Sequence, residues 1–236
     1  MIDKKYIYLG GVFLILIIIK FINPTIIQKI SFINYDFYQK VFNRGEVKDV
    51  TIVDIDEKSI AKVGQFPWRR DVYSKILKNL NQHNPQVIAF DIVFSEEDKQ
   101  NPKDLLLQLQ NESDQILDIE VIDTNKIFVN SIKNSKIILP ILGEPNDNFV
   151  KNDSKPKARI IAKGENPKNF IYKFKNKIIS LEEISSAASG IGSISLIPNI
   201  DGVIRNVPVL YDIDNRIWPS LALEAVRVAS GQKNLL

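Results

Sequence analysis

The feature that most limits what this chain can fold into is an apolar run near its start. Tyr6 to Ile22, YIYLGGVFLILIIIKFI, is 17 residues long and carries one charge, Lys20. A helix of roughly 20 apolar residues, within a range of about 17–25, crosses the hydrocarbon core of a bilayer. Lys20 lies near the end of the run, where its long side chain reaches the headgroups. Residues 1–23 are therefore predicted to form a transmembrane anchor that contacts membrane lipid through residues 6–22.

The flanks of this run predict its orientation. No small-x-small cleavage site follows it, which favours an uncleaved anchor over a removed signal peptide. Lys4 and Lys5 precede it on a short N-terminal side, so the positive-inside rule places the N-terminus inside the cell. No second apolar stretch of spanning length occurs in the sequence. We expect a single N-terminal pass through the cell inner membrane, with an extracytoplasmic (periplasmic) soluble domain.

Composition excludes several kinds of site. The 236 residues include no cysteine, which removes disulfides, thiolate catalysis and Cys-ligated metal centres. His83 is the single histidine, so a histidine-rich metal site is impossible. The net charge of +3 is too small to imply nucleic-acid binding. We therefore expect no nucleic-acid partner and no cofactor, and the sequence leaves any metal unknown.

The rest of the chain divides into a connector and one domain. Residues 24–45 form the connector, in which Pro24 ends the anchor and apolar residues recur at helical spacing. This spacing predicts a juxtamembrane helix, packed on the soluble domain in preference to lying on the bilayer. Residues 46–236 are predicted to form a single α/β domain with a mixed, partly parallel sheet. It ends in a C-terminal β-hairpin and a helix.

Local patterns place the elements of this domain. Apolar, β-rich runs predict buried strands at 50–55, 87–94 and 136–142. A helix over 71–82 separates the first two strands, which is typical of a parallel βαβ unit. Segments 192–197 and 203–211 flank Asp201-Gly202 and predict a hairpin. The final helix is expected over 218–230, with Pro219 in its first turn.

Residues 151–177 form a basic insertion, with nine Lys or Arg and two acidic residues. We expect a solvated loop in which 170–175 form one strand of an exposed hairpin. Contact with anionic lipid headgroups or with a protein partner is the alternative.

Polar residues follow the predicted strands at positions where α/β sheets bind ligands, outside the carboxyl ends of parallel strands. Asp54 and Asp56 end the first strand and point to the same side. Asp91 lies in the neighbouring strand, where a buried carboxylate requires a partner. Arg205 is expected to form a salt bridge with a carboxylate such as Asp91 or Asp201. The candidate ligand-binding residues are Asp54, Asp56, Trp68, Arg70, Asp91 and Arg205.

Two interpretations of the aspartates follow from local chemistry. An apolar strand followed by D-x-D resembles the haloacid-dehalogenase-type phosphatases, in which one of Asp54 and Asp56 would be the nucleophile and the other a general acid with Mg²⁺. The pattern is common, and the acidic SEED and YDID segments are poorly placed for that chemistry. The second interpretation is structural: the aspartates cap the next helix, and Arg70 pairs with one of them.

A third interpretation rests on ordered motifs: VDIDEKSIAKVGQFPWRRDVYSKILKNL, VIAFDIVFSEED, SISLIPNIDGVIRNVPVL and WPSLALEAVRVASG. Together they resemble the CHASE2 family of extracytoplasmic sensor domains over about residues 25–231. The family motifs fall on Asp54 or Asp56, Pro67-Trp68, Arg70-Asp71, Phe90-Asp91, Phe94, Asp201-Gly202 and Arg205. Arg69 departs from a frequent proline, and the basic insertion is not part of the pattern.

The resemblance implies a non-enzymatic signal-input module. Such domains lie outside the membrane, ahead of transmembrane helices and cytoplasmic kinase or cyclase outputs. We expect an unknown small-molecule or ion ligand, a homodimer, and a conformational change passed to the membrane. A purely structural periplasmic dimerisation scaffold is the alternative.

Overall fold

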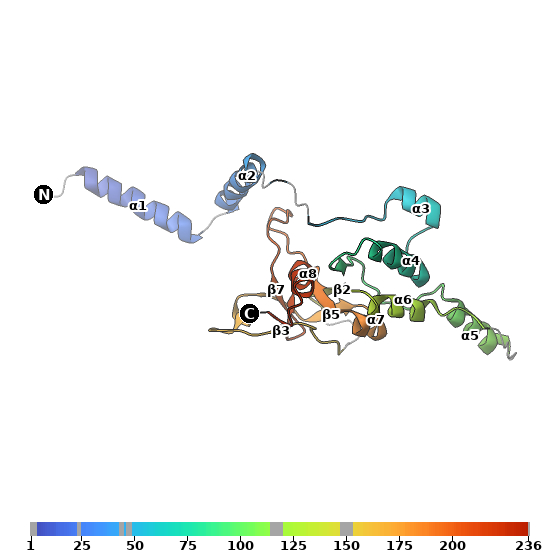
Figure 1. Ribbon diagram of the computed structural model, residues 1–236. Coiled ribbons are helices and arrows are strands. Elements are labelled where there is room, and N and C mark those ends of the chain that lie inside the picture. Colours follow the sequence, from blue (N-terminus) through green and yellow to red (C-terminus); the bar gives the residue numbers. More distant parts are fainter. Residues whose placement is uncertain are drawn as a thin grey trace. The chain divides into compact units, whose positions relative to one another are not determined.

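The structure, a computed structural model, describes residues 4–22, 25–42, 45, 49–113, 120–146 and 153–235. The chain divides into two compact units, residues 1–54 and 55–236. The first unit contains two helices, α1 (Lys4–Ile22) and α2 (Thr25–Val41) (Figure 1). Among the described residues, α1 is the one helix long and apolar enough to span a membrane. Both helices that the sequence predicts here are confirmed, and the packing of α2 on the soluble domain stays a prediction.

The buried strand predicted at 50–55 is wrong. No strand covers these residues, and Ile52 is 89% exposed. A β-rich apolar run forms a strand only where another strand supplies its hydrogen-bond partners. Such a partner is a property of the tertiary structure and is not encoded in the run itself.

The main sheet of the second unit is built around β2 (Ile137–Glu144). On one side β2 pairs in parallel with β6 (Gly190–Ser193). On the other, its start pairs in parallel with β1 (Ile88–Ala89) and its end antiparallel with β5 (Asn176–Ile179). The mixed, partly parallel sheet is therefore confirmed.

The parallel crossover differs from the predicted one. It joins β1 to β2 through α5 (Pro102–Ser113) and α6 (Thr124–Lys133), and residues 50–55 take no part. Of the strand predicted at 87–94, only β1 forms. After β1 the chain makes isolated hydrogen bonds and no continuous ladder with β2. Phe90 N donates to Ile138 O, and Phe94 N donates to the Ser180 hydroxyl.

The register assigns each face of the main sheet. Ile138 pairs with Gly190, so both residues face the same side. That side is covered by α8 (Leu221–Ala229), because a Cβ at Gly190 would lie 2.6 Å from the Glu224 Oε1 atom. Ile137, Leu139 and Ile191 face the opposite side and belong to the two hydrophobic cores.

The first core is covered by helices. It contains side chains from α4 (Arg70–Asn81), α6 and α7 (Glu182–Ala187). At its centre, the rings of Tyr73, Phe94 and Phe128 lie with centroids 4.9–5.8 Å apart. The short helix α3 (Glu57–Val63) precedes α4, and Figure 1 shows α4, α6 and α7 on one side of the second unit. The helix predicted over 71–82 is confirmed as α4.

The second core involves a three-stranded sheet of β4 (Tyr172–Phe174), β7 (Leu210–Ile213) and β8 (Arg216–Pro219). The predicted exposed hairpin at 170–175 is wrong, because β4 pairs in parallel with the distant β7. A small sheet of β3 (Arg159–Ile160) and β9 (Asn234–Leu235), and the 3₁₀ turn η1 (Pro167–Asn169), complete the unit.

The C-terminal hairpin lies later in the chain than predicted. Its strands are β7 and β8, joined at Asp214-Asn215, which both have positive φ. Asp201-Gly202 does form a turn, with Gly202 at φ 79° and Asn199 N donating to Val203 O. No strands flank this turn among the described residues, because segment 203–209 finds no ladder. The last helix starts at Leu221 rather than 218, capped by the Ser220 hydroxyl.

Candidate functional site

Trp68 and Arg70 are held where the chain enters α4. The Trp68 indole N–H donates to Gly64 O at 2.7 Å. The Arg70 guanidinium lies 4.5 Å from the centroid of the Phe94 ring, and its Nη2 donates to Glu96 O at 2.7 Å. Burial lowers the pKa of Arg70, and the Asp98 carboxylate opposes this shift. The Arg70 side chain is therefore part of the core lining and contacts the loop that follows β1.

That loop, residues 95–101, carries a buried carboxylate, Asp98, which is 7% exposed. Its Oδ2 accepts hydrogen bonds from Arg70 N at 2.9 Å and from the Thr124 hydroxyl at 2.8 Å. Its Oδ1 accepts one from Gln100 N at 3.1 Å. Arg70 and Thr124 are the first residues of α4 and α6, where backbone N–H groups and the helix dipole favour an anion. One carboxylate thus joins the N-termini of two helices.

Two further residues accept hydrogen bonds from backbone N–H groups in the first turn of α6. Asn101 Oδ1 accepts from Thr124 N at 3.0 Å. Asp123 caps the helix through Lys126 N at 3.0 Å and binds Lys103 Nζ at 2.9 Å. Burial opposes ionisation of Asp123, but the hydrogen bonds from Lys103 and Lys126 outweigh it, so its pKa lies below the usual value. The same contact with Asp123 raises the pKa of Lys103.

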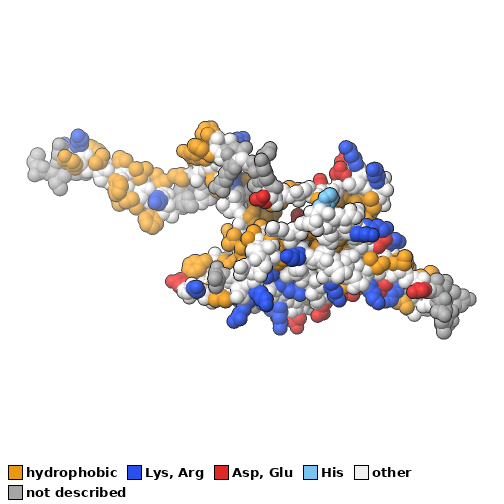
Figure 2. All heavy atoms as spheres, in the orientation of Figure 1, with side chains coloured by type: hydrophobic (Ala, Val, Ile, Leu, Met, Phe, Trp, Pro, Cys, Tyr) orange, Lys and Arg blue, Asp and Glu red, His pale blue; other side chains and the backbone are white. Residues whose placement is uncertain are grey.

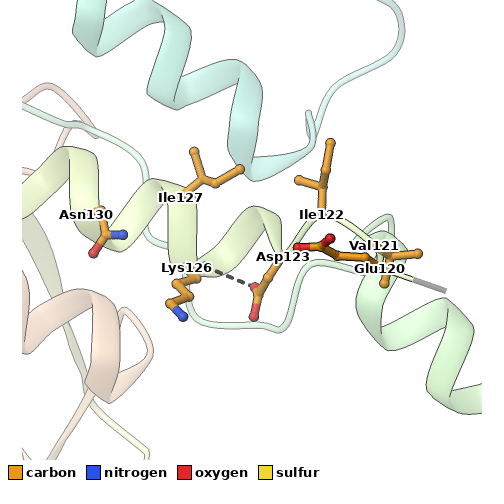
Figure 3. A pocket seen from close by; sticks show the side chains of 7 residues that line it. All are labelled: Glu120, Val121, Ile122, Asp123, Lys126, Ile127 and Asn130. Carbon is orange, nitrogen blue, oxygen red and sulfur yellow. Dashed lines mark hydrogen bonds between the residues drawn. The ribbon is translucent and has the colours of Figure 1, made fainter. Parts of the chain in front are cut away.

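Two cavities lie along α6. The larger, about 660 Å³, is lined mostly by charged and polar residues of the loop, α5, α6 and α7, together with two apolar ones: Glu97, Asp98, Lys99, Asn101, Lys103, Asp104, Leu105, Gln108, Asp123, Asn125, Lys126, Val129, Asn130, Lys133 and Glu183. The smaller, about 380 Å³, is drawn in Figure 3 and shares Asp123, Lys126 and Asn130 with it. Figure 3 shows Asp123 and Lys126 on one side of α6, with Ile122 and Ile127 pointing the other way. The buried Asp98 network therefore borders a charged cavity.

The site residues predicted from the sequence do not form one cluster among the described residues of the second unit. Asp56 caps α3, accepting at Oδ1 from Ser59 N at 2.8 Å and the Ser59 hydroxyl at 2.7 Å. These hydrogen bonds lower its pKa, and they confirm the capping role for this residue. Asp54 is exposed and is the last residue of the first unit. Within the described part of the second unit, no hydrogen bond or ion pair joins Asp56 to Arg70, so the predicted pairing is wrong for Asp56 and stays a prediction for Asp54.

The structure contradicts the prediction for Asp91 and confirms the one for Arg205. Asp91 is exposed, so its predicted burial is wrong, because the ladder between β1 and β2 ends at Ala89. Arg205 forms the expected salt bridge with Asp201, with Nη1–Oδ1 and Nη2–Oδ2 distances of 2.9 Å. This pair lowers the pKa of Asp201. A role of these residues in ligand binding stays a prediction.

Sequence reasoning missed the residues that form the buried network and line the cavity. They are Asp98, Asn101, Asp123, Thr124 and Asn125. Asp-Thr directly before an apolar-periodic segment is a helix start signal, and it would have located α6. No comparable signal marks Asp98, because an acidic loop usually faces solvent.

Comparison with known families gives one match, to the CHASE2 domain, over residues 12–235. Comparisons with curated proteins and with solved structures gave no match. CHASE2 is a family of extracytoplasmic sensory domains, and its members are sensors rather than catalysts. The match covers nearly the whole chain and includes α4, the Asp98 loop, α6 and the sheet. The chain belongs to the CHASE2 family.

Proposed function

We propose that this chain is the signal-input domain of a bacterial receptor, anchored in the inner membrane by α1 with its N-terminus inside. It binds a small molecule or ion outside the cytoplasm, acts as a homodimer and passes a conformational change to the membrane. The observation that carries the ligand-binding part is the charged cavity beside a buried carboxylate that joins α4 to α6. Family membership supports the sensory part.

The Asp98 loop supplies a physical route for the signal. A ligand changes a conformational equilibrium only through different affinities for the two conformations. A ligand in the cavity contacts the loop residues Glu97 and Asp98 directly. Any shift of this loop alters the hydrogen bonds that Asp98 accepts from Arg70 N and the Thr124 hydroxyl, and so changes the contacts at the first residues of α4 and α6. Binding and helix packing are therefore linked.

The phosphatase alternative finds no support in the site geometry. Asp56 already accepts two hydrogen bonds from Ser59. In the part of the chain that the structure describes, no group of three or more Asp, Glu or His residues could hold a metal ion. We therefore propose no catalytic residue.

A topology reporter tests the membrane part of the proposal. Alkaline phosphatase fused to the C-terminus of the full chain should be active in intact cells, because this enzyme folds only outside the cytoplasm. A green fluorescent protein fusion at the same position should be dark after export through the Sec pathway. As a control, the same two fusions to residues 24–236 should show the reverse pattern. A bright full-length fusion would rule out the proposed orientation.

A thermal-shift screen tests the sensory part. The full chain in detergent is screened against metal ions and small metabolites. A ligand at 100 times its Kd adds about 2.7 kcal/mol of stability, which corresponds to roughly 5–10 °C in Tm for a chain of this size. Glu97→Gln and Lys133→Gln should reduce the shift, whereas Lys78→Gln, on an exposed position of α4, should not.

The same screen decides between two locations. A hit that Asp91→Asn abolishes and the two cavity variants leave unchanged would move the site to the cluster predicted from sequence. The absence of any stabilising compound would count against ligand sensing altogether.

A further inference from the structure

One buried polar atom on the cavity wall lacks a partner. Asn125 lines the larger cavity and is 7% exposed. Its Oδ1 accepts no hydrogen bond within the part of the chain that the structure describes. A buried acceptor left without a donor costs roughly 1–3 kcal/mol. The atom is therefore a position where a ligand donor gains binding free energy.

The orientation of this amide is determined by its neighbour. Asn125 Nδ2 donates to Glu97 Oε2 at 3.3 Å. An ionised carboxylate only accepts hydrogen bonds, so the amide nitrogen and not the oxygen is the atom that contacts Glu97. A neutral donor would satisfy Oδ1 alone, whereas an ammonium group has three donors and also neutralises the adjacent carboxylate. The pair thus favours a cationic amine.

Two lysines of α6, the helix that carries Asn125, line the same cavity. Lys126 and Lys133 both line the cavity, and within the described ranges neither ammonium group has an ion-pair partner. The other two lining lysines are occupied: Lys103 binds Asp123, and Lys99 binds Glu96. The same cavity therefore presents an amine-binding group and a free cation, which matches a ligand with both charges.

We propose that the cavity binds a small zwitterion of the amino-acid class, an inference that rests on the proposed sensory function. Its ammonium group contacts Asn125 Oδ1 and Glu97, and its carboxylate faces Lys126. The Asn125 oxygen lies beneath the cavity surface, so a ligand reaches it only when the residues that cover it shift. Glu97 belongs to the 95–101 loop that carries Asp98, so occupancy changes the contacts that hold α4 and α6.

The test is calorimetric titration of the full chain in detergent with glycine, L-alanine and L-glutamine, and with methylammonium and acetate as single-charge probes. Zwitterions should bind more tightly than either single-charge probe. Asn125→Leu, which has nearly the same volume, should weaken zwitterion binding about tenfold. Lys126→Gln should weaken it about threefold and leave methylammonium binding unchanged. Lys78→Gln is the control and should change neither.

A second variant covers the case in which Asn125→Leu folds poorly. Glu97→Gln changes an exposed side chain and should weaken both zwitterion and methylammonium binding. Unchanged zwitterion affinity in Glu97→Gln, or tighter binding of acetate than of any zwitterion, would overturn the assignment. If zwitterions fail but another compound from the screen binds through Glu97 and Lys133, the amino-acid assignment is wrong and the sensory function stands. If no compound of the screen binds the chain at all, both are wrong.

Discussion

Replacing Arg227 by Met should lower the free energy of unfolding by about 3–5 kcal/mol, because it leaves a buried carboxylate without its counter-ion. Glu224 is fully buried on the face of α8 that meets the sheet. Arg227 binds it twice at 2.7 Å, from Nε to Oε2 and from Nη2 to Oε1. After the change, one hydrogen bond to this carboxylate remains among those described, from Ile191 N at 3.2 Å.

Equilibrium unfolding in urea measures this effect as a lower midpoint with an unchanged m value. The double variant Glu224→Met with Arg227→Met should recover much of the loss, since an apolar pair of similar volume often replaces a buried ion pair without cost. Lys233→Met, an exposed change near the same terminus, is the control. If the free energy of unfolding of Arg227→Met lies within about 1 kcal/mol of the parent value, Glu224 is neutral or hydrated in the variant. That result would disprove the predicted cost of an unpaired buried carboxylate.

Replacing Phe128 by Ala should cost a similar amount, about 3–5 kcal/mol, because it opens a cavity in the first core. Phe128 is completely buried. Its ring lies edge-on to Phe94 at 4.9 Å and tilted against Tyr73 at 5.8 Å. Aromatic pairs of this kind contribute about 0.5–1.5 kcal/mol beyond the buried area, so the loss should reach the upper part of the range.

The matched control for this variant is Ile127→Ala on the same helix. Ile127 is 40% exposed, so the change should cost no more than about 1 kcal/mol. Urea midpoints of the two variants give the comparison. Equal losses at the two positions would mean that α6 does not bury Phe128 against α4. Because α6 also carries Asn125, the Phe128 variant should weaken ligand binding at the cavity as well.

Elements whose pattern is local could be predicted from the sequence. The apolar run at 6–22, the periodic segments at 25–42 and 71–82, and the β-rich run at 136–142 all appear as α1, α2, α4 and β2. The salt bridge between Arg205 and Asp201 also needed only a spacing of four residues. The helices and the salt bridge depend on contacts within one or two turns of chain, whereas β2 also requires the hydrogen bonds that β1, β5 and β6 supply.

Strand pairing and burial could not be predicted in this way. Residues 50–55 and 203–209 are as rich in β-branched residues as β2, yet neither forms a strand in the structure. The apolar neighbours of Asp91 predict that it is buried, yet it is exposed, whereas Asp98 in an acidic loop is buried. Each outcome depends on which distant segment supplies the hydrogen bonds.

The sequence by itself determined the long apolar helix α1, the absence of thiol and histidine-rich chemistry, and the CHASE2 family, since these depend on composition and on motifs in a fixed order. Only the tertiary structure decided that Asp98 joins α4 to α6 and that Asn125 lines a charged cavity. These residues are 27 positions apart in the chain. They form one site because the starts of two helices and the loop after β1 meet at a single point, where a buried carboxylate accepts hydrogen bonds from the Arg70 N–H group and the Thr124 hydroxyl.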